Sequence, residues 1–269
     1  MTSKHPHIII IGAGIVGASL TYHLAKQNAR VTLLDKAAKP ANEATEKSFA
    51  WIVAGYDATQ MYMSLRQQAI SDWHRVEDEL NRRLKIDWTG ALTWLESNEK
   101  TEEWMCKLKH SDSKVRLVEE QELRLLEPNL KTVPSLAMFA EDEGAINPNL
   151  TTNLFIKAAQ EWGAKVLLDA EVLSLLINKS AIEGVATNKG TIIADVVVLA
   201  TGVNTVSLCH PLHLKLPIDV SPAILMELHN PDRFVNHIVS NPFMEIRAAS
   251  DTLTLAAENY IDESSIQQR

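Results

Sequence analysis

The sequence is poor in cysteine, in long apolar runs and in positive charge. It has only two cysteines, Cys106 and Cys209, and no Cys-x-x-Cys pair, which argues against a disulfide framework. Its apolar runs, such as Ile8–Ile11, are far shorter than the roughly 18 residues needed to span a bilayer. The net charge of −8 argues against a broad surface for nucleic acid or an anionic membrane. We therefore expect a cytoplasmic protein with reduced thiols, no transmembrane segment and no nucleic-acid partner.

A metal-binding pattern is also lacking. His210 and His213 form a His-x-x-His pair across a proline, but no third ligand lies nearby in the sequence, so we expect no metal site. What the chain does have is a hydrophobic fraction of 46% over 269 residues. That is enough for one large or two modest domains with a real core.

The most informative segment of the chain is residues 8–35. The run Ile8–Ile11 leads into Gly12-Ala-Gly14-Ile-Val-Gly17, and a stretch with helical periodicity then leads into a second apolar strand ending at Asp35. Asp35 falls 18 residues after Gly17, close to the roughly 20 expected of a dinucleotide fingerprint. The sequence therefore predicts a strand–helix–strand unit that binds a dinucleotide.

Each part of this motif has a physical role. Gly12 permits the tight turn after the first strand, Gly14 lets the main chain approach a pyrophosphate, and Gly17 lets the helix pack closely. The N-terminus of the helix offers unpaired N–H groups to the anion. Asp35 can accept hydrogen bonds from both ribose hydroxyls and would repel a 2′-phosphate, which disfavours NADP.

Two alternatives remain for this segment. It can be a tight strand-to-helix turn that binds nothing, or the apolar core of a signal peptide followed by a cleavage site of small residues. Neither alternative explains an acidic residue at the position of Asp35.

The rest of the chain predicts two interleaved domains of an α/β protein. Residues 196–202 have the pattern of a buried parallel strand that ends at a glycine beside a ligand. This strand belongs with the N-terminal unit, whereas the segment between them has the pattern of a separate mixed α/β layer. We predict one domain from residues 1–84 and 143–210, and a second domain from residues 85–142 and 211–269.

Four further motifs are spread along the chain. They are Ala44–Ile52, with an Ala-Thr and a Ser three residues on, Glu127-Pro-Asn-Leu130, Glu143-Gly-Ala-Ile-Asn-Pro148 and Leu199-Ala-Thr-Gly202. Together with the N-terminal fingerprint, they resemble the FAD-dependent amine oxidoreductases related to D-amino acid oxidase, glycine oxidase and sarcosine oxidase. Asn147 stands where that family usually has Asp. The short strands predicted over 171–187 lie where these flavoproteins have a β-meander.

The resemblance implies a Rossmann-type FAD-binding domain with a parallel sheet and a β-meander, interleaved with a mixed-sheet α+β substrate domain. It also implies which residues hold FAD. These residues are Gly12, Gly14, Ile15, Val16 and Gly17 around the pyrophosphate, Asp35 and Lys36 at the ribose, Thr45 and Ser48 at phosphate or ribityl oxygens, the main chain of Val172 at the adenine, and Ala200 and Gly202 flanking the cofactor. Thr45 and Ser48 have the alternative of being turn hydroxyls, and Val172 of being strand core.

The resemblance implies oxidation of the C–N bond of a small amine or amino acid by hydride transfer to FAD. A substrate carboxylate would bind an arginine, and Arg247 on a predicted strand is a candidate, the alternative being a solvated strand arginine. Trp51 and Tyr56 are candidates for an apolar wall near the substrate, or for the core.

Members of that family continue well beyond the length of this chain, with a glycine-rich loop and a helix that face the flavin ring. We expect this chain to lack that C-terminal part, or a second chain to supply it. Three hypotheses follow. The first is an FAD-dependent amine oxidoreductase, the second is a truncated, non-catalytic remnant that binds FAD or ADP, and the third is an NAD-linked dehydrogenase, favoured if residues 171–187 formed a crossover helix.

Overall fold

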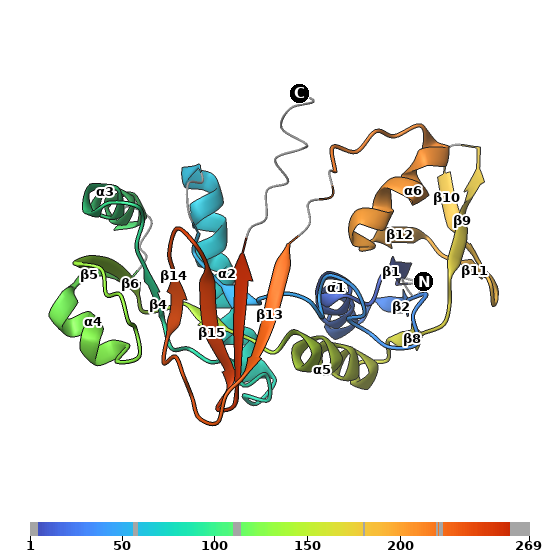
Figure 1. The fold of residues 1–269 in the computed structure, drawn as a ribbon. Helices are drawn as coiled ribbons and strands as arrows, with labels where there is room; N and C mark the ends of the chain where they lie inside the picture. Colours follow the sequence, from blue (N-terminus) through green and yellow to red (C-terminus); the bar gives the residue numbers. More distant parts are fainter. Residues whose placement is uncertain are drawn as a thin grey trace. The chain divides into compact units, whose positions relative to one another are not determined.

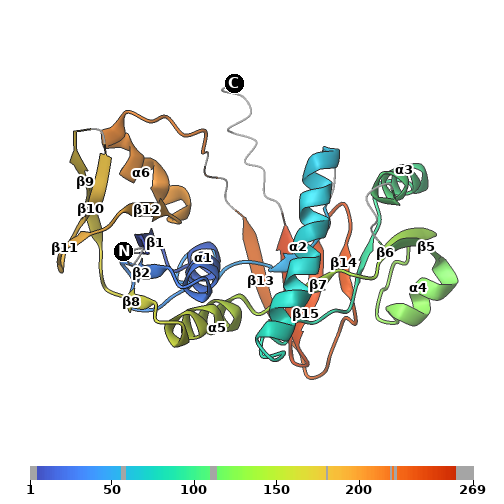
Figure 2. The ribbon, with the colours of Figure 1, turned by 180° about the vertical axis from the view of Figure 1, so that it is seen from behind.

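A computed structural model describes residues 5–55, 59–109, 114–179, 181–218, 220 and 223–258. The chain divides into two compact units, and Figures 1 and 2 show both from opposite sides. Unit 1 comprises residues 1–48 and 148–220, and unit 2 comprises residues 49–147 and 221–269. The elements of unit 1 are β1 (His7–Ile11), α1 (Ile15–Lys26), β2 (Arg30–Leu34), α5 (Pro148–Glu161), β8 (Lys165–Leu167), β9 (Val172–Asn178), β10 (Ala181–Thr187), β11 (Gly190–Ile193), β12 (Val196–Leu199), η1 (Gly202–Asn204), α6 (Thr205–Cys209) and η2 (His210–Leu212).

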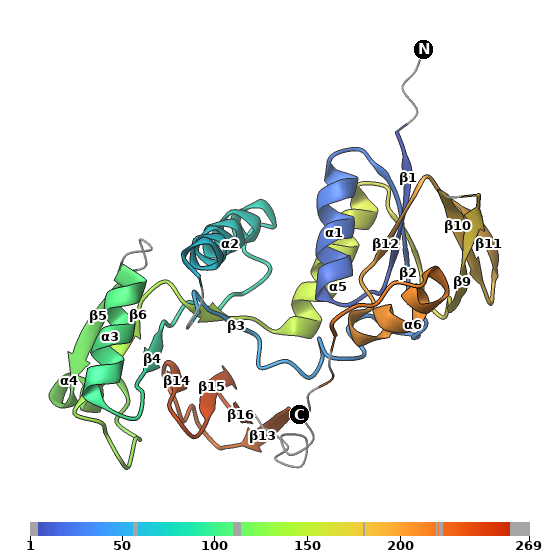
Figure 3. The same ribbon diagram turned by 90° about the horizontal axis from the view of Figure 1, so that it is seen from above.

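Unit 1 is built on a four-stranded parallel sheet in the order β12-β1-β2-β8. The inner strands β1 and β2 are mostly apolar because both faces are covered there, and Ile9, Ile10 and Leu33 have no exposed surface. Figure 3 shows α1 and α5 side by side on one face, with β9–β11 on the other. The two helices pack through Tyr22 and Phe155, whose rings lie 5.5 Å apart between centroids.

Strands β9, β10 and β11 form a three-stranded antiparallel sheet. Val172, Leu175 and Ile192 from these strands pack onto the core formed by Ile9 and Leu34 of the parallel sheet. The expected β-meander is therefore present. The crossover helix that would have favoured an NAD-linked dehydrogenase is absent from the described parts of this segment.

Unit 2 is built on a seven-stranded mixed sheet in the order β13-β16-β15-β14-β4-β6-β5. Only the β14–β4 pair is parallel, and β3 and β7 form a separate two-stranded ladder. The elements of unit 2 are β3 (Trp51–Ile52), α2 (Gln60–Glu79), β4 (Ala91–Thr93), α3 (Asn98–Lys109), β5 (Val115–Glu119), α4 (Glu120–Leu126), β6 (Leu136–Ala140), β7 (Gly144–Ala145), β13 (Ile224–His229), β14 (Ile238–Ser240), β15 (Glu245–Ser250) and β16 (Leu253–Glu258).

Helices α3 and α4 pack against alternate side chains of β6, on the two faces of this sheet. Met138 packs in a cluster with Trp104 and Leu108 of α3. Its neighbour Ala137 packs in a different cluster with Leu123 of α4. Because successive residues of a strand point to opposite faces, α3 and α4 cover opposite sides. This arrangement gives β6 a buried residue on each face.

The structure places residues 49–84 and 143–147 in unit 2 and residues 211–220 in unit 1, unlike the predicted boundaries. The physical reason is long-range pairing that no local pattern reveals. Strand β3 pairs with β7, and the buried carboxylate of Glu77 on α2 accepts hydrogen bonds from the Ile86 amide and the Trp88 indole. These contacts join α2 to the mixed-sheet unit.

Candidate functional site

The carboxyl ends of three parallel strands meet at one edge of the unit 1 sheet. Strand β1 lies between β2 and β12 in this sheet. After β1, the chain first forms β2 on one side of it and later forms β12 on the other side. The Gly12 amide donates to the Leu34 carbonyl, and the Ala200 amide donates to the Ile11 carbonyl, both at 2.8 Å. Such a switch point in an open parallel sheet is where ligands bind, so we take this edge as the candidate site.

Gly12 and Gly17 are glycines for steric reasons that the structure makes explicit. Gly12 has φ +106, and a Cβ there would lie 2.4 Å from the carbonyl oxygen of Ala200. A Cβ on Gly17 would lie 1.8 Å from the carbonyl oxygen of Gly12. Helix α1 therefore starts in direct contact with the turn that precedes it. A side chain at Gly17 would push the helix away from this turn, and one at Gly12 would displace the main chain at Ala200.

The N-terminus of α1 has the features of an anion site. Its N-cap is Gly14, which has no side chain to cap the helix, and no acidic residue lies in its first turn. The Ile15 amide donates to Oγ1 of Thr45 at 3.1 Å, and Val16 is 60% exposed. A hydroxyl that accepts from the helix can still donate its own proton to a phosphate. These residues fit the pyrophosphate of a dinucleotide.

Asp35 follows β2 and faces the glycine turn. Its Oδ2 accepts a hydrogen bond of 2.6 Å from the Ala13 amide, and its Oδ1 accepts one of 2.8 Å from the Ala37 amide. Each carboxylate oxygen retains a further lone pair, so the group can still accept ribose hydroxyls. The Ala170 amide donates to the Asp35 carbonyl at 2.8 Å, which brings the start of β9 at Val172 to the same edge.

The remaining predicted cofactor residues lie around the same edge of unit 1. Lys36 is exposed and forms an ion pair of 3.5 Å with Glu43. The Ser48 amide donates to the Thr45 carbonyl at 3.3 Å. Gly202 has φ +53 at the start of η1, and a Cβ there would meet open space. The assignment of all these residues to FAD stays a prediction.

Arg247 on β15 is almost fully buried, with 4% of its surface exposed. Its Nε donates to the Phe49 carbonyl at 2.6 Å, and its other nitrogens donate to the carbonyls of Ile146 and Ala248 at 3.2 Å. Burial lowers the pKa of the guanidinium to about 10. These contacts give Arg247 a structural role inside unit 2 and do not support binding to a substrate carboxylate.

Trp51 is half-buried on β3 and packs with Phe49, Ala91 and Ile238 in a small core cluster. Its indole Nε1 donates to Glu143, a buried carboxyl whose pKa burial raises to about 8. Tyr56, its predicted companion, lies outside the described residues. The sequence motif Glu143–Pro148 included Glu143, but it did not indicate the contact of Glu143 with Trp51.

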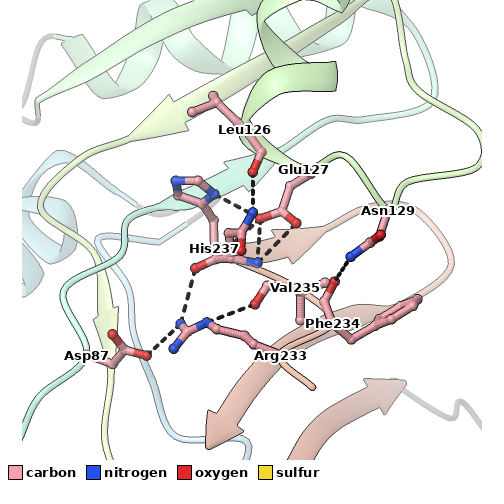
Figure 4. A network of polar contacts seen from close by, with 9 residues as sticks. Asp87, Leu126, Glu127, Asn129, Arg233, Phe234, Val235 and His237 are labelled. Atoms are coloured by element: carbon pink, nitrogen blue, oxygen red, sulfur yellow. Dashed lines mark hydrogen bonds and ion pairs between the residues drawn. The ribbon is translucent and has the colours of Figure 1, made fainter. Parts of the chain in front are cut away.

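Glu127 is the centre of a polar network in unit 2 (Figure 4). Its carboxylate is 1% exposed and accepts hydrogen bonds from the Asn236 amide, the His237 amide and Nδ1 of His237. The Asn236 side chain donates in turn to the Leu126 carbonyl at 2.8 Å. The motif Glu127-Pro128 thus fixes the turn that leads into β14. A sequence pattern cannot show a contact that joins residues 110 positions apart.

Among the described residues there is no group of three or more His, Cys, Asp or Glu side chains arranged to hold a metal ion. In the same part of the chain, no helix combines the length and the apolar character that crossing a membrane requires. Cys106 and Cys209, which both lie within it, form no disulfide.

Proteins of one family match most of this sequence. Residues 7–251 match the family model described as DAO, FAD dependent oxidoreductase. Monomeric sarcosine oxidase from Bacillus sp. (strain B-0618) is 26% identical over 221 residues, which cover 80% of this chain and 56% of that enzyme. Glycine oxidase from Bacillus licheniformis is 27% identical over 205 residues, which cover 74% of this chain and 55% of that enzyme. The chain thus spans about half the length of these two curated relatives.

Solved structures with the same fold cover nearly the whole chain. The crystal structure of glycine oxidase from Bacillus cereus ATCC 14579 has a TM-score of 0.85 at 17% identity, and the match covers 98% of this chain and 76% of that one. The crystal structure of L-proline dehydrogenase from P. horikoshii has a TM-score of 0.80 at 22% identity and covers 96% of this chain and 70% of that one. At these identities the likeness shows the fold.

Proposed function

The chain belongs to the DAO family of FAD-dependent oxidoreductases, and from this premise we propose that it oxidises the C–N bond of a small amine or amino acid. Family membership confirms the predicted family and cofactor, and the structural likeness confirms the predicted fold class. The observation that carries the proposal is the edge of unit 1 where Gly14, Thr45 and Asp35 converge. We assign FAD binding to unit 1 and the substrate to unit 2.

The residues of unit 1 would hold the adenosine and pyrophosphate parts of FAD. The first turn of α1 and the Thr45 hydroxyl would bind the pyrophosphate, and Asp35 would accept the ribose hydroxyls. The main chain at Val172 would lie against the adenine. When bound, FAD supplies the two-electron acceptor for a hydride from the carbon that carries the amine. The protein's contribution is to orient both groups.

No acid–base pair is required by this proposal. A neutral amine can give up a hydride without a strong catalytic base, and we assign no such base to a residue of this chain. The substrate class is supported by relatives named for oxidation of sarcosine, glycine and 4-methylaminobutanoate. The two cysteines without a disulfide suit the cytoplasmic location that we propose.

The test is reduction of flavin by substrate. The purified chain is saturated with FAD, and glycine, sarcosine, L-proline and 4-methylaminobutanoate are added one at a time without oxygen. Bleaching of the visible flavin band by one of them, with release of the corresponding carbonyl product, supports the proposal. Bound flavin that none of a broad amine panel reduces would contradict it.

A second candidate function is binding of FAD or ADP without catalysis. The residues assigned to FAD above all suit its adenosine and pyrophosphate parts, and this observation favours binding without catalysis. The same experiment separates the two, because a non-catalytic binder retains FAD and ADP but shows no bleaching with any amine.

A further inference from the structure

A row of polar side chains crosses three neighbouring strands on one face of the unit 2 sheet. Glu245 on β15 pairs directly with Ser240 on β14, and Ser240 pairs with Thr93 on β4. Directly paired residues of neighbouring strands point to the same face and lie about 5 Å apart. Thr93 also pairs with Met138, which packs against α3, so the row lies on the face that α3 covers. A carboxylate and two hydroxyls therefore stand side by side on this face.

The row runs from a covered part of the sheet toward a more accessible part. Thr93 and Ser240 are 1% and 3% exposed, whereas Glu245 is half-buried. Ala257, the next residue of the row on β16, is half-buried as well. At the inner end, Oγ1 of Thr93 is buried without a hydrogen-bond partner among the described residues. The carboxylate of Glu245 is thus the polar group of this row that a small molecule can reach.

The carboxylate of Glu245 has no partner within the described part of the chain. No hydrogen bond or ion pair from these residues reaches it, and burial alone raises the pKa of the carboxyl group. Arg247 lies two residues further along β15, but its guanidinium donates to three main-chain carbonyls instead. A half-buried charge without a partner is costly, and such groups gather at functional sites. The Glu245 carboxylate is therefore available to a ligand.

We propose that Glu245 determines the substrate class of unit 2, because it binds a protonated amino group and repels a carboxylate; this assignment rests on the proposed function. An ammonium group offers three N–H donors and forms charge-assisted hydrogen bonds with a carboxylate. A substrate carboxylate in the same place would face a like charge. Since the amine that gives up a hydride is neutral, the ammonium held by Glu245 is a second amino group. The substrate class that fits is a small diamine rather than an amino acid.

Binding of the amino group can be measured without flavin, so a failure of the proposed oxidation does not obscure it. The full chain, labelled with ¹⁵N, is titrated at about pH 7 with butylamine and separately with butyrate, at constant ionic strength. We expect butylamine to shift the amide resonances of Ser240 and Glu245 saturably, and butyrate to leave them unchanged. Glu245→Gln should weaken the binding of butylamine roughly tenfold or more. Glu227→Gln, which alters an exposed carboxylate on β13 of the same sheet, is the matched control and should keep the affinity.

Urea unfolding separates a ligand-binding role of Glu245 from a structural one. Glu245→Gln removes an unpaired charge, so we expect it to unfold at a urea concentration no lower than that of the wild type. Butylamine should raise the midpoint of the wild type but not that of Glu245→Gln. A less stable Glu245→Gln chain would assign the carboxylate a structural role and overturn the proposal, as would equal resonance shifts with butylamine and butyrate.

The substrate class is then tested on the chain saturated with FAD. N-methylputrescine and 4-methylaminobutanoate differ in having an amino group or a carboxylate at the far end of the same chain of carbons. We expect N-methylputrescine to bleach the flavin faster, and Glu245→Gln to remove this advantage. Equal rates in the wild type, or a preference for 4-methylaminobutanoate, would overturn the assignment of diamines. Butylamine that binds at Glu245 while no amine bleaches the flavin would refute the oxidation but support the ammonium site.

Discussion

The carboxylate of Asp35, at the end of the second strand, accepts a hydrogen bond of 2.6 Å from the amide of Ala13, inside the glycine turn. This bond ties the acid that would bind the ribose to the turn that would bind the pyrophosphate. The two halves of the predicted adenosine site are therefore one connected structure. A change at Asp35 should disturb both halves.

We predict that Asp35→Asn weakens FAD binding. An amide in this position can accept from Ala13 or Ala37 but not from both, and it loses the charge-assisted bonds to ribose. Charged hydrogen bonds of this kind correspond to a loss of roughly 10- to 100-fold in affinity. Titration with FAD followed by flavin fluorescence measures the change. Glu161→Gln, an exposed carboxylate on α5, is the matched control and should leave the affinity as it is.

We predict that Gly17→Ala destabilises unit 1 strongly. Its Cβ would lie 1.8 Å from the Gly12 carbonyl oxygen, so α1 would have to shift off the sheet. The expected loss in the free energy of unfolding is more than about 3 kcal/mol. Gly163→Ala controls for the loss of glycine, because Gly163 has φ +88 but open space around it, and should cost about 1–2 kcal/mol. Equal costs in urea unfolding would show that the close approach does not matter.

Glu127→Ala should destabilise unit 2. Removing the carboxylate leaves the amides of Asn236 and His237 and the His237 ring without their acceptor, at an expected cost of about 3 kcal/mol or more. Glu120→Ala removes an exposed carboxylate that pairs with Arg124, and its cost should stay below about 0.5 kcal/mol. Thermal unfolding of both variants tests this contrast. A loss for Glu127→Ala as small as that for Glu120→Ala would contradict the role of the network.

Glu143 should make the protein less stable as pH rises. Its pKa is raised from the ordinary 4.5 to about 8, so between these values the folded state binds a proton that the unfolded state has released. The free energy of unfolding then falls with pH, by at most about 1.4 kcal/mol per unit, and becomes level above the folded pKa. The Glu143→Gln variant should lack this component. Urea unfolding of both proteins from about pH 5 to about pH 9 measures the difference. Parallel pH profiles for the two proteins would refute this assignment.

The first strand–helix–strand unit could be predicted from sequence because its signals are local. The apolar run Ile8–Ile11 forms all but the first residue of strand β1, and the spacing from Gly17 to Asp35 placed the acid at the correct strand end. The β-meander was likewise predictable from the short strands and from the turn around Gly190. Periodicity and turn residues carry this information within a few residues of where it acts.

The parts that could not be predicted depend on distant contacts. Residues 49–84 joined the other unit because β3 pairs with β7 far along the chain. Arg247 has the residue type of a carboxylate ligand, but its partners are the carbonyls of Phe49, Ile146 and its neighbour Ala248. Strand β14 is only three residues long and fully buried, so it has no alternation that would reveal it. Residue type and spacing cannot encode such pairings.

We propose that the edge of unit 1 around Asp35 and Thr45 binds FAD. The most direct test is the visible absorption spectrum of the purified chain before and after addition of FAD and removal of the unbound excess. We predict a retained oxidised-flavin spectrum with about one FAD per chain, and a weaker one in Asp35→Asn. Absence of retained flavin with FAD in excess, from a chain that is folded by circular dichroism, would contradict it.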